Sequence, residues 1–208
     1  MESPLSKDTP KSRRTRVRIL DAAMRLFAEI GYHAATNSEI ATAAQLTRGA
    51  MLYHFATRED LVAAAADHIQ AARLALFDAA AADPPVGGDA TSHAIEAYWR
   101  LLAEPPFVAF AELEAVARTD PMVRERLAGA QAAFDRAQVG ATFSALAQAG
   151  QGPRFQASRD LARFLLEGLA RASLAYDDEA RIQNLIAVVD RAVRMLNRKG
   201  DVQELWPD

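Results

Sequence analysis

Apolar residues recur at helical spacing along nearly all of the chain, and polar or Gly/Pro-rich segments separate the runs. No segment alternates apolar and polar residues for long enough to indicate a strand, so the pattern predicts an all-α fold. The breaks combine proline, whose φ is fixed, with flexible or capping residues. Beyond residue 57 the pattern predicts helices over residues 58–82, 91–103, 106–118, 121–149, 158–176 and 178–198.

Two short helices and a tight turn are predicted ahead of this series. Thr36 and Glu39 have the spacing of a capping box, in which each side chain satisfies a free backbone donor, so a helix should begin near Asn37. Residues 45–46 interrupt that helix, and the hydroxyl of Thr47 can cap a second one. The segment is therefore predicted to form a helix, a turn and a helix.

The outer face of the second short helix carries groups suited to double-stranded DNA. Gly49 and Ala50 have almost no side chain, so the backbone there can approach the floor of a major groove, which is wide enough to admit a helix. Arg48 has the forked guanidinium needed for bidentate base recognition. Four further residues can donate to phosphate oxygens, which fix the register on DNA without reading sequence: Thr47, Tyr53, His54 and Arg58.

A set of residues between positions 13 and 61 falls, without a gap, in the order of a known family pattern. The set comprises Ile19, Leu20, Ala22, Ala23, Leu26, Phe27, Gly31, Tyr32, Thr36, Ile40, Ala41, Gly49, Phe55 and Leu61. On these residues the segment resembles the DNA-binding domain of the TetR-like (tetracycline-repressor) transcriptional regulators. The resemblance implies a flexible basic tail over residues 1–12, a helix-turn-helix DNA-binding domain over 13–60, and a helical effector-binding and dimerisation domain over 61–208.

Two positions depart from the family pattern, and DNA docking should differ there. Gln45 stands where the family usually has glycine, so a left-handed backbone would cost more than usual. Leu52 stands where the family typically has a tyrosine that donates to phosphate. For His54 a packed surface imidazole remains an alternative to a phosphate contact. The expected DNA-binding set is Arg14, Asn37, Thr47, Arg48, Gly49, Ala50, Leu52, Tyr53, His54 and Arg58.

The net charge of −3 conceals an asymmetry between the two parts of the chain. Residues 1–58 contain nine Lys or Arg against five Asp or Glu, whereas residues 59–208 contain 15 against 22, so the parts should have different partners. The positive charge gathers in a basic arm ahead of the first apolar run, suited to phosphate or minor-groove contact. The basic arm consists of Lys7, Lys11, Arg13, Arg14, Arg16 and Arg18.

Composition limits the cellular setting and the chemistry. No apolar run approaches the roughly 20 residues that span a bilayer, and the N-terminus lacks the apolar segment of a signal peptide. The chain has no cysteine, which excludes disulfides and thiolate chemistry and fits a cytoplasmic protein. The four histidines show no metal-ligand spacing, so neither a metal nor another cofactor is expected, and no membrane partner.

The last two predicted helices carry apolar stripes that suggest a homodimer. Small residues in the first stripe would let helix backbones approach closely, and the resemblance implies a four-helix interface between two chains. Two recognition helices about 34–36 Å apart would then fit successive major grooves of a palindromic operator. The alternative is that both stripes face the core of one chain. The expected interface is Leu161, Leu165, Gly168 and Ala172 with Ile182, Ile186, Val189 and Val193.

Aromatic and polar residues in the middle of the chain could line an effector pocket. In the family, the corresponding helices usually enclose a small molecule that shifts the separation of the two DNA-binding domains. The inventory favours a largely hydrophobic organic effector, with an ordinary aromatic core as the alternative. The expected pocket is His68, Trp99, Phe107, Phe110, Glu114, Phe134 and Phe143.

The leading hypothesis is a homodimeric repressor that an effector releases from DNA. An activator and an effector-independent DNA binder remain alternatives that the sequence does not separate. An enzyme using His68, His93 or Glu114 is disfavoured, because the chain has no nucleophile motif, phosphate-cradling loop or metal spacing, and no catalytic residue is assigned. A purely structural helical oligomer is disfavoured by the basic arm and by the small residues at 49–50.

Overall fold

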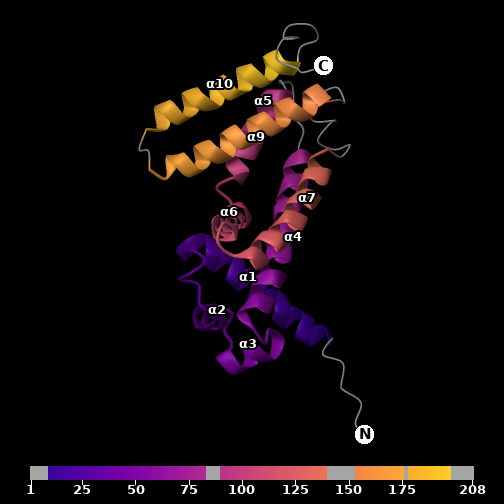
Figure 1. Ribbon diagram of the computed structural model, residues 1–208, viewed down its shortest axis with the longest axis vertical. Helices are drawn as coiled ribbons and strands as arrows, with labels where there is room; N and C mark the ends of the chain where they lie inside the picture. The colour runs from indigo at the N-terminus through magenta and orange to yellow at the C-terminus, as the bar shows by residue number, and fades with distance from the viewer. Residues whose placement is uncertain (1–8, 83–89, 140–152, 176–177, 198–208) are drawn as a thin grey trace. The chain divides into compact units, whose positions relative to one another are not determined.

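The computed structural model describes residues 9–82, 90–139, 153–175 and 178–197. Every regular element in these ranges is an α-helix, which confirms the all-α fold (Figure 1). The helices are α1 (Pro10–Ile30), α2 (Asn37–Ala43), α3 (Arg48–His54), α4 (Arg58–Ala82), α5 (Ala90–Leu101), α6 (Pro105–Ala117), α7 (Pro121–Val139), α9 (Pro153–Ser173) and α10 (Glu179–Asn197). Within the described ranges, none of the helices is both long enough and apolar enough to cross a membrane.

Helix boundaries follow the predicted breaks closely. α4 has the expected bounds, and α5, α6 and α10 begin and end within two residues of theirs. α9 begins at Pro153 rather than at residue 158, because proline is tolerated in the first turn, where its missing N–H has no partner in any case. α7 is described to Val139, and its expected extension to residue 149 lies outside the described residues.

The chain divides into two compact units, each with its own packing. Unit 1 contains the residues up to Leu74 together with Glu104–Phe134, and unit 2 contains Ala75–Ala103 together with the residues from Asp135 onward. The resemblance implies a second domain over residues 61–208. The structure instead groups α6 and the first part of α7 with α1, α2 and α3.

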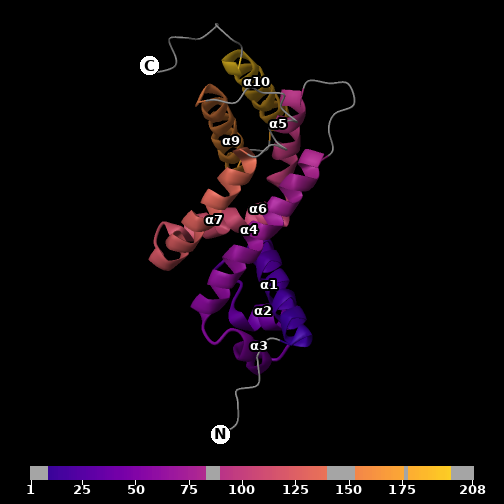
Figure 2. The same ribbon diagram turned by 90° about the vertical axis from the view of Figure 1, so that its right-hand side faces the viewer.

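The core of unit 1 holds the two short helices in place. α1 packs against α6 and α2, and Figure 2 shows α1, α2 and α3 side by side. Ile19 and Phe27 of α1, Ile40 of α2, Met51 of α3 and Leu113 of α6 are each fully buried. Removing a side chain of this size from water stabilises a fold by ~1.5–3 kcal/mol, so these contacts fix how α3 is presented.

Unit 2 is built on an antiparallel pair of helices, α9 and α10, with α5 packed against them (Figure 1). Hydrogen bonds between side chains fix the position of α5. The Ser92 hydroxyl donates to Asp190 Oδ1 of α10 at 2.8 Å, and the Tyr98 hydroxyl donates to Glu167 Oε1 of α9 at 2.8 Å. The orientation of the two long helices is thus set by side chains of the same chain.

Candidate nucleic-acid interface

Threonine caps begin both short helices, as the sequence predicts. The backbone N–H of Glu39 donates to Thr36 Oγ1 at 3.2 Å, so α2 begins at Asn37. The N–H of Ala50 donates to Thr47 Oγ1 at 3.1 Å, so α3 begins at Arg48. A cap of this kind is worth about 1 kcal/mol, and the two caps define where each helix starts.

The turn between α2 and α3 is left-handed at Gln45, where φ is +54°. Its N–H donates to the carbonyl of Thr42 at 2.9 Å, and the N–H of Leu46 donates to the carbonyl of Ala41 at 2.9 Å. This pair of bonds is a Schellman motif, which satisfies the last carbonyls of α2 and requires a left-handed residue at the position of Gln45. The conformational cost expected for a left-handed glutamine therefore applies at this position.

Arg16 of α1 holds the end of α3. Its Nη1 donates to the backbone carbonyl of His54 at 2.8 Å, and its guanidinium lies 4.3 Å from the ring centre of Phe55. A cation at this position also interacts favourably with the negative end of the helix dipole. The sequence indicates Arg16 only as part of the basic arm, because it contains no sign of a contact across 38 residues.

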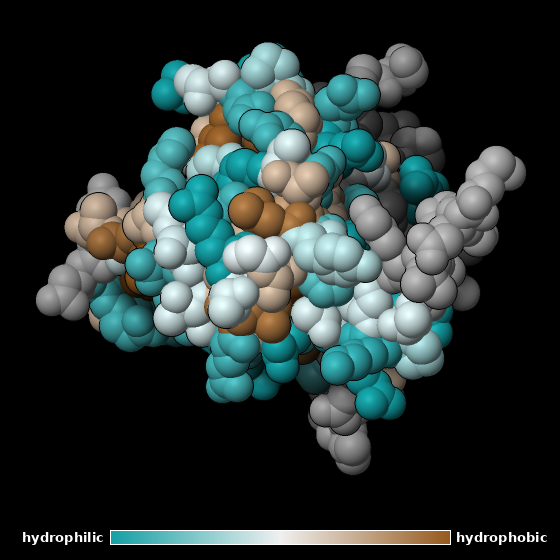
Figure 3. All heavy atoms as spheres, turned by 90° about the horizontal axis from the view of Figure 1, so that it is seen from below, coloured by the Kyte–Doolittle hydropathy of each residue, from teal (hydrophilic) through white to brown (hydrophobic). Residues whose placement is uncertain are grey.

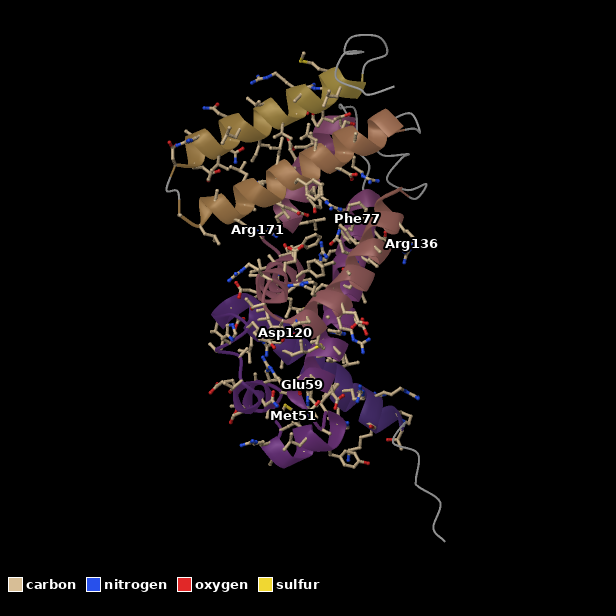
Figure 4. The ribbon with its side chains drawn as sticks, viewed as in Figure 1. Met51, Glu59, Phe77, Asp120, Arg136 and Arg171 are labelled. Atoms are coloured by element: carbon tan, nitrogen blue, oxygen red, sulfur yellow. The ribbon has the colours of Figure 1, made fainter. Side chains whose placement is uncertain are left out.

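One side of α3 is anchored to the core, and its other side faces solvent. Met51, labelled in Figure 4, and Phe55 are buried beneath the helix. An additional Cβ at Gly49 would meet nothing within 4 Å. Figure 3 views this end of the molecule, where apolar side chains lie scattered among hydrophilic ones. The exposed residues of the expected set here are Thr47, Arg48, Gly49, Leu52 and Tyr53, with Ala50 and His54 half-buried.

His54, the last residue of α3, is half-buried. Burial, and secondarily the charge of Arg16, lower the pKa of His54 below its ordinary value. Its ring contacts that of Tyr53 edge to face, with 5.3 Å between the ring centres. Burial therefore favours the neutral form of the imidazole, which still carries one N–H donor.

Arg58, expected to contact phosphate, is bound within the chain. Its Nη1 donates to the carbonyl of Ala35 at 2.8 Å and to Asn37 Oδ1 at 3.2 Å, and its Nη2 donates to the carbonyl of Tyr32 at 3.1 Å. The guanidinium also lies 4.8 Å from the ring centre of Tyr32 and 5.5 Å from that of Phe27. Arg58 and Asn37 therefore join the start of α4 to the segment between α1 and α2.

Comparison of the sequence with known proteins agrees with the helix-turn-helix geometry of α2 and α3. Residues 19–65 match the sequence profile of the bacterial regulatory proteins of the tetR family. Residues 19–65 are therefore a segment of the tetR-family type. A segment of 55 residues is 44% identical to the HTH-type transcriptional regulator AcrR of Shigella flexneri, and it spans 26% of this chain and 26% of AcrR.

Similarity to solved structures extends over most of the chain. A crystal structure described as a putative TetR-family transcriptional regulator from Rhodococcus sp. has a TM-score of 0.67 at 21% identity, covering 89% of this chain and 100% of that one. The multidrug binding protein EbrR, complexed with proflavin, has a TM-score of 0.57 at 25% identity, covering 85% of this chain and 98% of that one. The fold is thus shared well beyond the matched N-terminal segment.

Three residues of the expected effector pocket meet in unit 1 around Arg73, a residue that the sequence does not single out. The guanidinium of Arg73 lies 3.7, 4.3 and 5.0 Å from the ring centres of Phe110, Phe134 and Phe107. Arg73 is only 3% exposed, and its Nη1 donates to Gln70 Oε1 at 3.0 Å. The aromatic cluster therefore surrounds a cation of its own chain.

The other expected pocket residues are not gathered with these rings. His68 Nε2 lies 2.7 Å from Asp21 Oδ1, Glu114 is half-buried on α6, and Trp99 belongs to unit 2. Phe143 lies outside the described residues. In the part of the chain that the structure describes, no three His, Cys, Asp or Glu side chains are grouped to hold a metal ion.

The expected dimer interface divides between the surface and the core of unit 2. On α9, Leu161 and Leu165 are 44% and 48% exposed, Gly168 is exposed and Ala172 is half-buried. On α10, all four expected residues are buried within the chain, as the alternative interpretation of the stripe required: Ile182, Ile186, Val189 and Val193. The large apolar side chains that α10 exposes are instead Leu185, Val188 and Met195.

Proposed function

We propose that this protein is a sequence-specific DNA-binding transcriptional repressor, which acts as a homodimer and leaves a palindromic operator when a small organic effector binds. One observation carries the proposal: α3 is fixed from beneath by Met51 and Phe55, and it faces solvent with Arg48 beside the open backbone of Gly49. A rigid helix with this outer face fits a major groove.

The charge around α3 supports DNA as the partner. Between Glu39 and Glu59 the chain has no acidic residue. Arg14 lies exposed on the first turns of α1, where a cation can bind phosphate. Thr47 and Tyr53 are exposed donors, so phosphate contacts can flank the base contact that we assign to Arg48.

Binding to the DNA upstream of the protein's own gene tests this proposal. If the dimer neutralises on the order of 6–10 phosphates, affinity should fall by roughly 10³–10⁵ between 50 and 200 mM salt. Arg48→Ala should remove the preference for the bound sequence, whereas Arg126→Ala, at an exposed position of α7, should not. Binding that ignores both salt and sequence would contradict the proposal.

We propose that the dimer forms through the exposed apolar side chains of α9 and α10. These are Leu161, Phe164 and Leu165 on α9 and Leu185, Val188 and Met195 on α10. Contiguous exposed apolar surface commonly marks a protein interface. Leu165→Glu should give a monomer by analytical ultracentrifugation and weaken operator binding, whereas Ala128→Glu, which adds the same charge at an exposed site of α7, should give a dimer. A wild-type monomer at micromolar concentration would refute this interface.

We propose an organic effector because the related EbrR is described as a multidrug binding protein complexed with proflavin. In this chain Arg73 already occupies the faces of three aromatic rings, which disfavours a second cation there. Neutral and acidic aromatic compounds should therefore raise the melting temperature more than quaternary ammonium compounds of similar size. An effector must also bind the DNA-free form more tightly, because equal affinity for both forms shifts nothing. Compounds that bind without releasing the operator would contradict effector control.

A further inference from the structure

Leu52 is an apolar side chain in the middle of the exposed face of α3. It is 36% exposed, and it follows Arg48 by four residues and Gly49 by three, so the three positions lie on one side of the helix. The side chains that attach α3 to the core are Met51 and Phe55, which are 0% and 2% exposed. The contacts that anchor the helix are therefore made by other residues, and Leu52 is available to a partner.

The partner that this face suits is a polyanion with a small apolar group on it. Arg48 and the exposed Arg13 and Arg14 of α1 are cations, and no acidic residue lies between Glu39 and Glu59. Leucine has no donor, so placing it against a phosphate would remove water from that charge without a compensating hydrogen bond. The group that meets Leu52 must be uncharged and apolar.

The edges of the base pairs in a major groove present one such group. Guanine, adenine and cytosine show hydrogen-bond donors and acceptors there, and thymine adds its C5-methyl group. An added Cβ at Gly49 would meet nothing within 4 Å, so no side chain stands between the backbone of α3 and the groove floor next to Leu52. A leucine on this face can thus come into contact with a methyl group at the base edge.

We propose that Leu52 reads the C5-methyl group of a thymine in each half of the binding site. This inference rests on the proposed function, because it assumes that α3 enters the major groove. Leu52 then distinguishes thymine from the other bases by van der Waals contact with the methyl group and by exclusion of water, without a hydrogen bond. Arg48, one helical turn earlier, reads a neighbouring base by its guanidinium.

Removing single methyl groups from the bound DNA tests the proposal. In vitro selection with the full-length protein first defines the bound duplex. Each thymine is then replaced in turn by deoxyuridine, which lacks only the methyl group, and dissociation constants are measured by fluorescence anisotropy at one salt concentration. At one thymine per half-site, the replacement should weaken binding about fourfold, the change that ~0.8 kcal/mol for one buried methyl corresponds to. Replacing both together should weaken it roughly 15-fold.

Variants of α3 assign that loss to a side chain. Leu52→Ala should bind the thymine and deoxyuridine duplexes equally well at that position, while Leu52→Met, which stays apolar, should still distinguish them. Tyr53→Phe, a change at the neighbouring exposed position, should weaken binding to both duplexes alike and leave their ratio unchanged. Circular dichroism confirms that each variant keeps its helical content.

Three outcomes would overturn the assignment. They are a selected site in which no thymine responds to loss of its methyl, a Leu52→Ala protein that retains the full thymine preference, and a loss of affinity in Leu52→Ala that is equal for every duplex. The last would indicate that Leu52 packs against protein. Selection that enriches no duplex at all would instead refute the proposed function, so failure at the two levels is distinguishable.

Discussion

Replacing Arg58 by alanine should cost the protein much of its stability without changing how its DNA binding depends on salt. The three hydrogen bonds from Arg58 join the start of α4 to the carbonyls of Ala35 and Tyr32 and to the side chain of Asn37. Two rings lie beside the guanidinium, those of Phe27 and Tyr32. Alanine would leave the carbonyls without these partners and the rings without this cation.

The magnitude follows from these contacts. Hydrogen bonds from a charged donor are worth ~1.5–3 kcal/mol each, so three would give roughly 4–9 kcal/mol if none were replaced. Arg58 is half-buried, and water can reach part of the site in the variant. We therefore expect a loss of about 2–4 kcal/mol, which lowers the melting temperature by roughly 5–15 °C in a chain of this size.

Arg58→Lys separates this structural role from a contact with DNA. Lysine keeps the positive charge but cannot donate to three acceptors from a planar fork, so most of the stability loss should remain. The assays are urea denaturation followed by circular dichroism, and the slope of log affinity against log salt at a temperature where both variants are folded. A stable Arg58→Ala protein, or a salt slope reduced by about one per site, would show that Arg58 binds phosphate instead.

Three further changes test individual features of unit 1. Gln45→Gly should raise the free energy of unfolding by up to about 1 kcal/mol, because glycine adopts the left-handed backbone without strain. The matched change Thr42→Gly, within α2, should lower the free energy of unfolding by ~0.5–1 kcal/mol. Equal losses for the two variants in urea denaturation would show that the backbone at Gln45 is not strained. Because burial lowers the pKa of His54, the unfolded chain binds the proton more tightly, so the His54 contribution is present above about pH 6.5 and is lost as the pH falls below it. Thermal melts of His54→Gln should lack this part of the acid loss, and an unchanged pH profile would contradict the assignment. Gly31→Ala should lower the free energy of unfolding by ~1–3 kcal/mol, since φ is +81° and the new Cβ would lie 3.2 Å from Glu112 Oε2. Adding Glu112→Ala to this variant removes the steric contact, so it should restore only that part of the lost stability. Full restoration would show that the backbone at residue 31 is not strained.

The features that sequence reasoning predicted well are those fixed by neighbouring residues. Thr36 and Thr47 cap helices through N–H groups three residues away, so spacing alone identifies them. The left-handed backbone at Gln45 agrees with the resemblance, because the family pattern usually has glycine at this position. Proline and glycine mark the later breaks for the same local reason.

The features that sequence reasoning did not predict depend on residues far away in the chain. Arg58 and Arg73 look like surface charges in the sequence, yet one bonds across 21 to 26 residues and the other lies among three rings. α10 shows a second limit, because it has apolar residues on two faces. Periodicity finds the stripe through Ile182 and Val189, but the stripe itself carries no information about which helix will cover it.

α1 is a single uninterrupted helix of 21 residues, and at 1.5 Å per residue it forms a rod roughly 30 Å long. Its early turns carry exposed cations, one of them, Arg16, holds the end of α3, and the helix packs along α6. Within unit 1, α1 contacts both α6 and α3, so a displacement of α6 that moved α1 would change the tilt of α3 and the position of the flanking cations together.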